Sequence, residues 1–149
     1  MGLLGFGAAV ALAAVVGGLA AAGSSAEYAA LDQPAWSPPS WLFTPVWTVL
    51  YVTIAISGWQ VWRRVGLSRP LLPYAIQLVL NAAWTPLFFG AGAYGWAAIE
   101  IIVLWFAIGA TVLAFWRVHR VAALLLLPYW AWVTFAAALN IAIWWLNRQ

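Results

Sequence analysis

Long apolar stretches dominate the pattern of hydrophobic and polar positions along this chain. Five of them lie near residues 3–22, 42–62, 72–90, 95–116 and 121–146. A helix of roughly 20 residues spans the hydrocarbon core of a bilayer, so each stretch is long enough to cross it. None shows the alternating apolar and polar positions of a transmembrane β-strand. The pattern therefore predicts an all-α membrane protein, a five-transmembrane-helix bundle that forms a single domain over residues 1–149.

The first stretch has a second interpretation, as a cleaved secretory signal. Its small residues Ala20, Ala21 and Ala22 resemble a cleavage site. Secretory signals begin with positively charged residues, however, and this chain has none before its first apolar stretch. We therefore favour a membrane helix and keep the signal peptide as the alternative.

The composition supports membrane insertion and narrows the possible chemistry. Of 149 residues, 67% are hydrophobic and 6% are charged, whereas about 25% of the residues of a soluble domain are charged. The chain has no cysteine, which excludes disulfides and Cys-ligated metals. Its net charge of +3 comes from a small excess of arginine in loops, so nucleic-acid binding is not indicated.

The arginines predict the orientation in the membrane. Two loops hold most of them, Arg63, Arg64 and Arg69 in one and Arg117 and Arg120 in the other. Loops rich in arginine stay on the cytoplasmic side. We therefore expect loops 63–71 and 117–120 in the cytoplasm, and the first loop, residues 23–41, outside together with the C-terminus.

A proline- and tryptophan-rich segment leads into the second apolar stretch. Residues 34–51 contain three tryptophans and four prolines, in a chain with 13 tryptophans. Trp combines a large apolar face with one N–H donor, which suits a wall for a flat apolar ligand. Trp47 and Tyr51 lie one helical turn apart here, and an interfacial aromatic belt is the alternative interpretation of this pair.

A polar stripe is predicted on the third helix. Gln77, Asn81, Trp84 and Phe88 follow one another at spacings of 4, 3 and 4, which places them on one face. Amides in a membrane span need hydrogen-bond partners. The stripe indicates either hydrogen bonds that hold the helices together or a polar handle in an apolar cavity, and both interpretations stay open.

The remaining polar residues offer little catalytic chemistry. Glu100 is the one acid within a predicted span, and we interpret it as solvated or hydrogen-bonded. His119 is the only histidine, and a single histidine without neighbouring Cys, Asp or Glu makes no metal site. No glycine-rich phosphate loop occurs. Hydrolytic and ATP-driven reactions are therefore poorly supported.

Three motifs resemble those of the translocator protein / tryptophan-rich sensory protein family, also known as TspO or the peripheral-type benzodiazepine receptor family. They read Pro34-x-Trp36-x-Pro38-Pro39-x-Trp41 with Pro45-x-Trp47-Thr48-x-Leu50-Tyr51, then Gln77-Leu78-x-Leu80-Asn81-x-x-Trp84-Thr85-Pro86-x-Phe88-Phe89-Gly90, then Pro128-Tyr129-x-x-Trp132 with Phe135-Ala136, Leu139-Asn140 and Trp144-x-x-Asn147. The resemblance covers about Tyr28 to Asn147, with the motifs in order on the expected helices.

The resemblance implies a fold, a ligand class and a set of site residues. Members of this family form five-helix bundles, usually homodimers, with a ligand cavity between the helices under the first loop. They bind protoporphyrin IX or haem-like tetrapyrroles and other flat apolar molecules, some of them sterols, and require no cofactor. The matching ligand-binding positions of this chain are Trp47, Asn81, Trp84, Tyr51, Tyr28, Pro39, Trp96 and Ala136.

Two positions depart from the family pattern. Animal members carry a cholesterol motif with a Tyr and an Arg where this chain has Ile141 and Trp145, so specific sterol recognition is not predicted. Some bacterial members carry a second reactive Trp at the position of Ile141. Porphyrin breakdown in this chain would therefore need another partner for Trp47.

The resemblance favours an integral membrane receptor or sensor for porphyrin-type tetrapyrroles in a bacterial cell membrane. The first alternative is light- and oxygen-dependent porphyrin degradation, in which Trp47 is the candidate catalytic residue. The second is transport of a porphyrin or a lipid. Membrane lipid and a second copy of the chain are the expected partners, and no metal or nucleic acid is expected.

Overall fold

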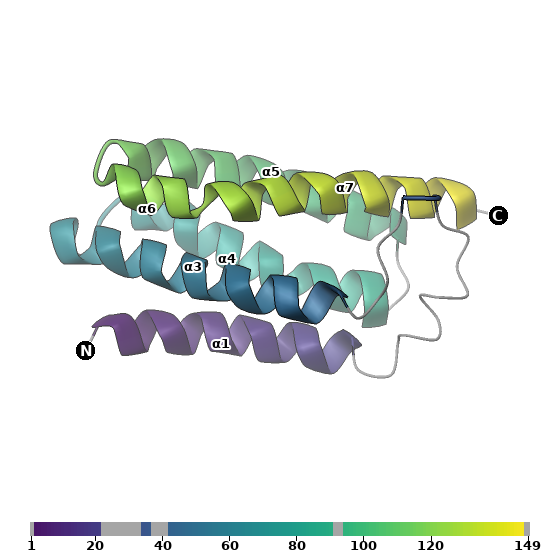
Figure 1. Ribbon diagram of the computed structural model, residues 1–149, viewed down its shortest axis with the longest axis horizontal. Coiled ribbons are helices and arrows are strands. Elements are labelled where there is room, and N and C mark those ends of the chain that lie inside the picture. The colour runs from purple at the N-terminus through teal and green to yellow at the C-terminus, as the bar shows by residue number, and fades with distance from the viewer. Residues whose placement is uncertain (1, 22–33, 37–41, 91–93, 148–149) are drawn as a thin grey trace.

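A computed structural model describes residues 2–21, 34–36, 42–90 and 94–147, and it is built of helices packed side by side (Figure 1). The elements are α1 (Gly2–Ala21), α3 (Phe43–Val65), α4 (Leu71–Thr85), the π-helical segment η2 (Pro86–Gly90), α5 (Tyr94–Trp116), α6 (Arg120–Leu125) and α7 (Leu127–Asn147). The described residues contain no strand. The predicted all-helical architecture is therefore confirmed for this part of the chain.

Among the described residues, three helical segments are long and apolar enough to cross a membrane by length and composition. They are Leu71–Phe88, Tyr94–Trp116 and Arg120–Asn147, and α1 adds a shorter apolar helix over Leu3–Leu12. Many large apolar side chains are exposed along the helices, including Val79, Phe106 and Leu113. Such side chains are stable against lipid tails, which are as apolar as they are. The helices are therefore those of an integral membrane protein.

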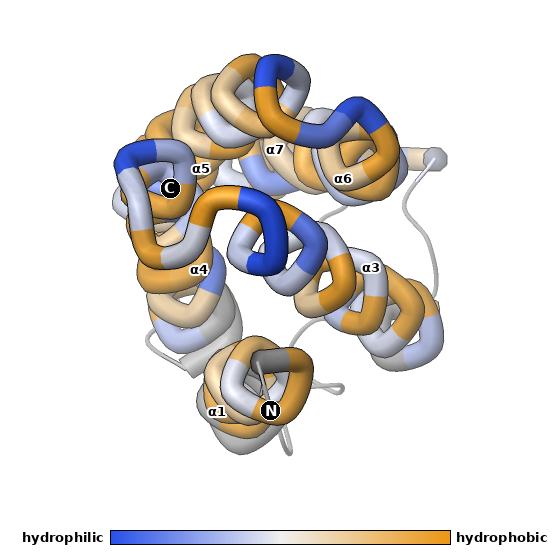
Figure 2. Tube along the Cα trace, turned by 90° about the vertical axis from the view of Figure 1, so that its left-hand side faces the viewer, coloured by the Kyte–Doolittle hydropathy of each residue, from blue (hydrophilic) through white to orange (hydrophobic). Residues whose placement is uncertain are grey.

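The helices form layers with α1 on one side and α5, α6 and α7 on the other (Figures 1 and 2). The middle layer consists of α3 and α4. The first helix packs against both of them, α5 packs against α4 and α7, and α3 also packs against α6. The turns α3–α4 and α5–α6 lie at the end of the bundle where α1 begins, and α7 ends at the opposite end.

Glycine allows the close approach of the first three long helices. A Cβ atom added at Gly58 of α3 would lie 2.5 Å from Cζ of Tyr74 on α4 and 2.8 Å from a ring carbon of Phe6 on α1. The Tyr74 hydroxyl donates to the carbonyl oxygen of Ile54 at 2.8 Å, and its ring stacks on Phe115 of α5 at 5.7 Å between centroids. One side chain therefore joins three helices at a position where a methyl group would not fit.

The fifth predicted helix is divided in two before Pro128. Proline has no N–H to donate to the carbonyl of Leu124, so the regular α-helical pattern cannot continue here. Just before the proline, the N–H of Leu126 donates to the carbonyl of Ala123, at 3.1 Å, in place of its regular α-helical acceptor, the carbonyl of Ala122. The carbonyl of Ala122 then accepts from the hydroxyl of Ser57 on α3, at 2.7 Å. A side chain of another helix thus replaces a hydrogen bond lost at the break.

The third predicted helix changes its winding at Pro86 for the same reason. Pro86 cannot donate to the carbonyl of Ala82, and the chain continues as the π-helical segment η2 to Gly90. Phe88 in this segment stacks on Trp84 at 5.1 Å and meets Tyr94 of α5 edge-on at 4.9 Å. The π-helical segment therefore connects α4 with the start of α5 through aromatic contacts.

Candidate ligand-binding site

A chain of hydrogen bonds connects α3, α4 and α7 in the interior of the bundle. The Tyr51 hydroxyl of α3 donates to Oδ1 of Asn81 on α4, at 3.1 Å. Nδ2 of Asn81 donates to the hydroxyl of Tyr129 on α7, at 2.8 Å. That hydroxyl in turn donates to Oε1 of Gln77, at 2.8 Å. Gln77 and Asn81 reach the same tyrosine because they lie one turn apart on one face of α4.

This chain of hydrogen bonds ends in an unused donor. The Nε2 amide nitrogen of Gln77 is buried and has no hydrogen-bond partner among the described residues. The residue as a whole is 1% exposed, so water does not reach it from outside. A buried amide without a partner is costly. The NH2 group of Gln77 is therefore a buried donor that no described residue uses.

Aromatic rings line this polar chain on one side. The ring of Trp47 stacks on Tyr51 at 5.5 Å between centroids, and it meets Tyr129 edge-on at 6.2 Å. Trp132 of α7 lies edge-on to Trp47 at 6.5 Å. These separations are typical of stabilising aromatic pairs. Trp47 and Tyr51 therefore belong to one cluster with α7, which the interfacial-belt interpretation does not require.

The aromatic contacts continue toward the described part of the first loop. Trp132 lies 5.4 Å from Phe135, and Phe135 lies 5.6 Å from Trp36. Trp36 is half-exposed, whereas Tyr129 is fully buried. A continuous row of rings therefore leads from the protein surface to the buried hydrogen bonds.

Trp84 belongs to a second, separate polar cluster. Its indole N–H donates to Oδ1 of Asn140 on α7, at 2.9 Å, and Nδ2 of Asn140 donates to the carbonyl of Tyr94 at 2.9 Å. Both Trp84 and Asn140 are buried. The polar stripe of α4 is thus divided, with Asn81 facing Tyr129 and Trp84 facing Asn140.

The predicted site residues are therefore only partly brought together. Trp47, Tyr51 and Asn81 share one cluster, and Ala136 is buried on α7, one turn after Trp132. Tyr28 and Pro39 lie outside the described residues.

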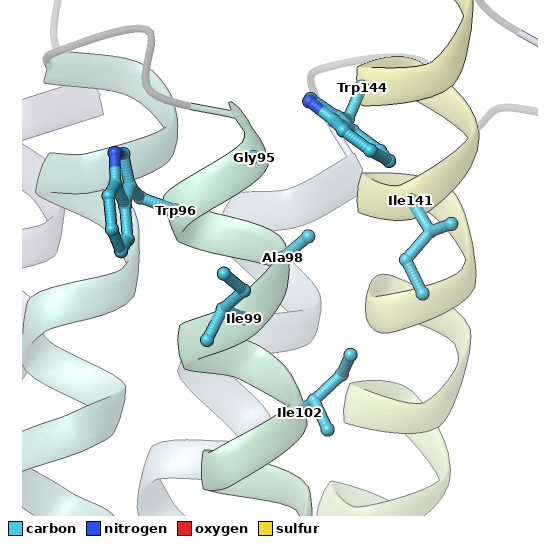
Figure 3. Close-up of a pocket in the computed structure, with 7 residues that line it drawn as sticks. All are labelled: Gly95, Trp96, Ala98, Ile99, Ile102, Ile141 and Trp144. Carbon is cyan, nitrogen blue, oxygen red and sulfur yellow. The ribbon is translucent and has the colours of Figure 1, made fainter.

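Trp96 lies elsewhere, on the outer surface of α5. It is 71% exposed and lines a groove between α5 and α7 of about 600 Å³ (Figure 3). The residues that line this groove are Gly95, Trp96, Ala98, Ile99, Ile102, Ile141 and Trp144. Ile141 also lines a second apolar groove, of about 610 Å³, together with Trp145. The two positions that depart from the sterol motif therefore face outward.

Besides Gln77, which the polar stripe already named, the cluster contains two residues that are absent from the predicted site, Tyr129 and Trp132. Both stand in the motif Pro128-Tyr129-x-x-Trp132, and a spacing of three places them on one face of a helix. That spacing was the available signal. It could not show that Tyr129 reaches two amides of another helix.

Glu100 corrects one interpretation made from the sequence. Both carboxyl oxygens are buried and have no hydrogen-bond partner among the described residues. The interpretation of a solvated or hydrogen-bonded carboxyl was therefore wrong, because packing of α5 in the bundle covers both oxygens and no described side chain donates to them. His119 has a structural role, since its Nδ1 accepts from the N–H of Ala122 at 3.4 Å and caps α6.

Comparison with known proteins identifies the family of this chain. The TspO/MBR family matches residues 6–146, which is nearly the whole sequence. The chain belongs to the TspO/MBR family. The translocator protein of Sus scrofa is 42% identical over 122 residues, which are 78% of this chain and 72% of the pig protein.

Bacterial members of the TspO/MBR family are similar to this chain at the same level. The tryptophan-rich protein TspO of Chlorobaculum tepidum is 41% identical over 124 residues, 80% of this chain and 78% of that protein. The tryptophan-rich sensory protein of Cereibacter sphaeroides is 37% identical over 120 residues, 80% of this chain and 76% of that protein. The resemblance carried by the three motifs is thereby confirmed.

Proposed function

We propose that this TspO/MBR protein is an integral membrane receptor or sensor that binds porphyrin-type tetrapyrroles such as protoporphyrin IX. The observation that carries the proposal is the buried hydrogen-bond chain from Tyr51 to Gln77 beside the ring of Trp47. It combines flat aromatic surface with directed polar groups in an apolar interior, which is the usual composition of a small-molecule site.

Each part of the cluster has a role toward such a ligand. Trp47 would stack on the face of the macrocycle, and an aromatic contact of this kind contributes about 0.5–1.5 kcal/mol beyond burial. The unused N–H of Gln77 and the amide of Asn81 would donate to a polar edge of the macrocycle. Trp36 and Phe135 would line the entrance, because their rings connect the surface with Trp132 and Trp47.

The proposal includes a membrane arrangement. We propose that α1, α3, α4 with η2, α5, and α6 with α7 form five membrane spans. The basic turns at residues 63–71 and 117–120 then lie in the cytoplasm, and the first loop and the C-terminus lie outside a bacterial cell membrane. A homodimer is proposed from family membership.

The test is a titration of the purified protein in detergent with protoporphyrin IX, in the dark, following the absorbance of the porphyrin. Wild type is compared with Trp47→Phe and Asn81→Ala. Trp116→Phe is the matched control, because Trp116 is exposed at the far end of α5 and has no part in the cluster. We expect saturable binding in wild type and control, and about fivefold to tenfold weaker binding in Asn81→Ala, the effect of one lost hydrogen bond.

Two results would contradict the receptor proposal. One is absorbance change that does not saturate and is equal in all four proteins, which indicates adsorption to an apolar surface. The other is saturable binding that Trp47→Phe and Asn81→Ala leave unchanged, which places the ligand elsewhere, for example in the groove beside Trp96.

A second candidate function, light- and oxygen-dependent porphyrin degradation, is favoured by the surroundings of Trp47. Ile141 stands where some family members carry a second reactive Trp, but Trp132 lies 6.5 Å from Trp47 and could take that place. Dioxygen would be the oxidant and the porphyrin the molecule oxidised. Transport of a porphyrin or lipid stays a prediction for a liposome flux assay.

Illumination separates degradation from binding. Porphyrin bound to wild type should lose its absorbance in light with dioxygen, and should keep it in the dark or under argon. Trp132→Phe should slow the loss, whereas Trp130→Phe should not, because Trp130 packs against Trp105 on the α5 side of α7. Equal loss in all variants and in free porphyrin would rule out a role for the protein.

A further inference from the structure

A basic surface lies at one end of the bundle, where α3 ends and α5 turns into α6. It consists of the exposed residues Arg63, Arg64, Arg117 and Arg120. Figure 2 shows this end toward the viewer, with hydrophilic positions gathered at the turns. Nη1 of Arg64 donates to the carbonyl of Val118 at 3.3 Å, which ties the end of α3 to the turn between Arg117 and Arg120.

The positive charge of this basic surface is not neutralised by the described part of the protein. None of its guanidinium groups forms an ion pair with a described residue, and Glu100 is the one acid among those residues. Glu100 precedes Trp116 by 16 residues of helix, about 24 Å at 1.5 Å per residue. The basic surface therefore attracts an anion from its surroundings.

Two tryptophans place this surface at the depth of the lipid headgroups. The guanidinium of Arg63 lies over the ring of Trp59, 4.6 Å from the centroid, and that of Arg120 lies over the ring of Trp116, at 5.0 Å. Trp at the end of a membrane helix lies at the level of the headgroups. A ring covers one face of the planar guanidinium and leaves N–H groups along its edge for an acceptor such as phosphate.

We propose that the basic surface binds the phosphodiester headgroup of an anionic phospholipid, between Arg64 at the end of α3 and Arg120 at the start of α6. The carbonyl of Val118 already holds Arg64 in place, and the Trp116 ring does the same for Arg120. Because these two side chains are already held in place, they lose less conformational entropy when the lipid binds. The lipid then links α3 with the α5–α6 turn.

The test measures lipid binding to the full-length protein in detergent by calorimetry. The probes are dioctanoyl phosphatidylglycerol, dioctanoyl phosphatidylcholine and inorganic phosphate. We expect the anionic lipid to bind more tightly than the zwitterionic one, and phosphate not to displace it. Arg64→Gln and Arg120→Gln should each raise the Kd for phosphatidylglycerol about fivefold, the effect of one arginine near an anionic membrane surface.

Arg69→Gln is the matched control, because Arg69 is exposed in the α3–α4 turn and removing it changes the net charge equally. It should raise the Kd less than Arg64→Gln and Arg120→Gln do, because no described contact holds Arg69 between the end of α3 and the start of α6. Arg64→Lys keeps the charge but not the planar group and should be intermediate. Unchanged thermal stability in phosphatidylcholine verifies folding of each variant.

Two outcomes would overturn the proposal. If Arg69→Gln weakens binding as much as Arg64→Gln and Arg120→Gln, the attraction is a general effect of charge and there is no site. If inorganic phosphate binds equally well and displaces the lipid, the surface is a site for a free anion. Neither outcome depends on porphyrin binding, so this inference and the proposed function fail separately.

Discussion

The hydroxyl of Tyr129 joins two amides of α4 to α7, and its removal tests the buried hydrogen-bond chain. Tyr129→Phe leaves Oε1 of Gln77 and Nδ2 of Asn81 without their present partner. We expect a loss of about 1–2 kcal/mol in stability, since hydrogen bonds between helices in membranes contribute about 1 kcal/mol each. The measurement is thermal unfolding in detergent, followed by circular dichroism.

Tyr74→Phe is the control for this loss. The Tyr74 hydroxyl donates to the carbonyl of Ile54, which lies within a regular helix. Removing this hydroxyl leaves only one acceptor lone pair unused, so Tyr74→Phe should lower the stability less than Tyr129→Phe does. Equal losses of stability in the two variants would mean that the hydrogen bonds of Tyr129 to Gln77 and Asn81 stabilise the protein no more than the single bond of Tyr74.

Glu100 is the residue whose replacement should stabilise the protein. Its carboxyl oxygens are buried without a described partner, and a buried carboxyl without a partner is costly. Glu100→Gln keeps the shape of the side chain and removes the ionisable group. We expect the Tm in detergent to rise by about 2–4 °C for each kcal/mol by which the free energy of unfolding increases.

The comparison with Glu100→Ala shows whether the charge or the volume matters. The alanine variant also removes side-chain volume and should be less stable than Glu100→Gln. A lower Tm in Glu100→Gln than in wild type would show that the carboxylate has a partner in the membrane, such as a bound cation or a ligand.

At the scale of the elements, the break between α6 and α7 depends on a hydrogen bond from another helix. Ser57→Ala removes the donor to the carbonyl of Ala122, which lacks its regular helical partner because of the break before Pro128. We expect a loss of about 1–3 kcal/mol, the cost of leaving a buried polar group unpaired. Thermal unfolding measures it.

Thr53→Val provides the matched control in the same helix. The Thr53 hydroxyl donates to the carbonyl of Leu50 within α3, so its loss disturbs no contact with α6. This variant should stay close to wild type. A larger loss in Thr53→Val than in Ser57→Ala would show that the hydroxyl of Ser57 does not support the break.

The packing of α1, α3 and α4 depends on the missing side chain at Gly58. Gly58→Ala places a methyl group within 3 Å of Tyr74 and Phe6, and overpacking costs about 1–3 kcal/mol. Gly7→Ala in α1 meets nothing within 4 Å and should be neutral or stabilising, because Ala favours helix more than Gly. Equal melting temperatures of Gly58→Ala and Gly7→Ala would contradict this close packing at Gly58.

At the scale of the whole molecule, membrane crossing by α3 can be tested with single cysteines. The chain has none of its own. Trp36 is 50% exposed before α3 and Leu67 is 87% exposed after it. We expect Trp36→Cys to react with a membrane-impermeant maleimide on intact cells, and Leu67→Cys to react only after permeabilisation. Labelling of both from the same side would contradict a membrane-spanning α3.

The sequence by itself determined where the helices lie and which family the chain belongs to. Apolar stretches of spanning length can form only helices or closed barrels in lipid, and these stretches had no strand pattern. The predicted boundaries therefore agree with the observed ones to within a few residues. The exceptions are local, at Pro86 and Pro128, where a missing N–H changed the winding and the continuity of a helix.

Only the tertiary structure decided which face of each helix is buried and which side chains meet. In a soluble protein the polar face of a helix marks the outside, but lipid accepts apolar side chains as readily as the bundle interior does. The sequence therefore could not tell that Trp96 faces outward, that the carboxyl oxygens of Glu100 are buried without a described partner, or that Tyr129 joins Asn81 and Gln77. Those outcomes depend on how each helix is rotated about its axis, which packing against its neighbours determines.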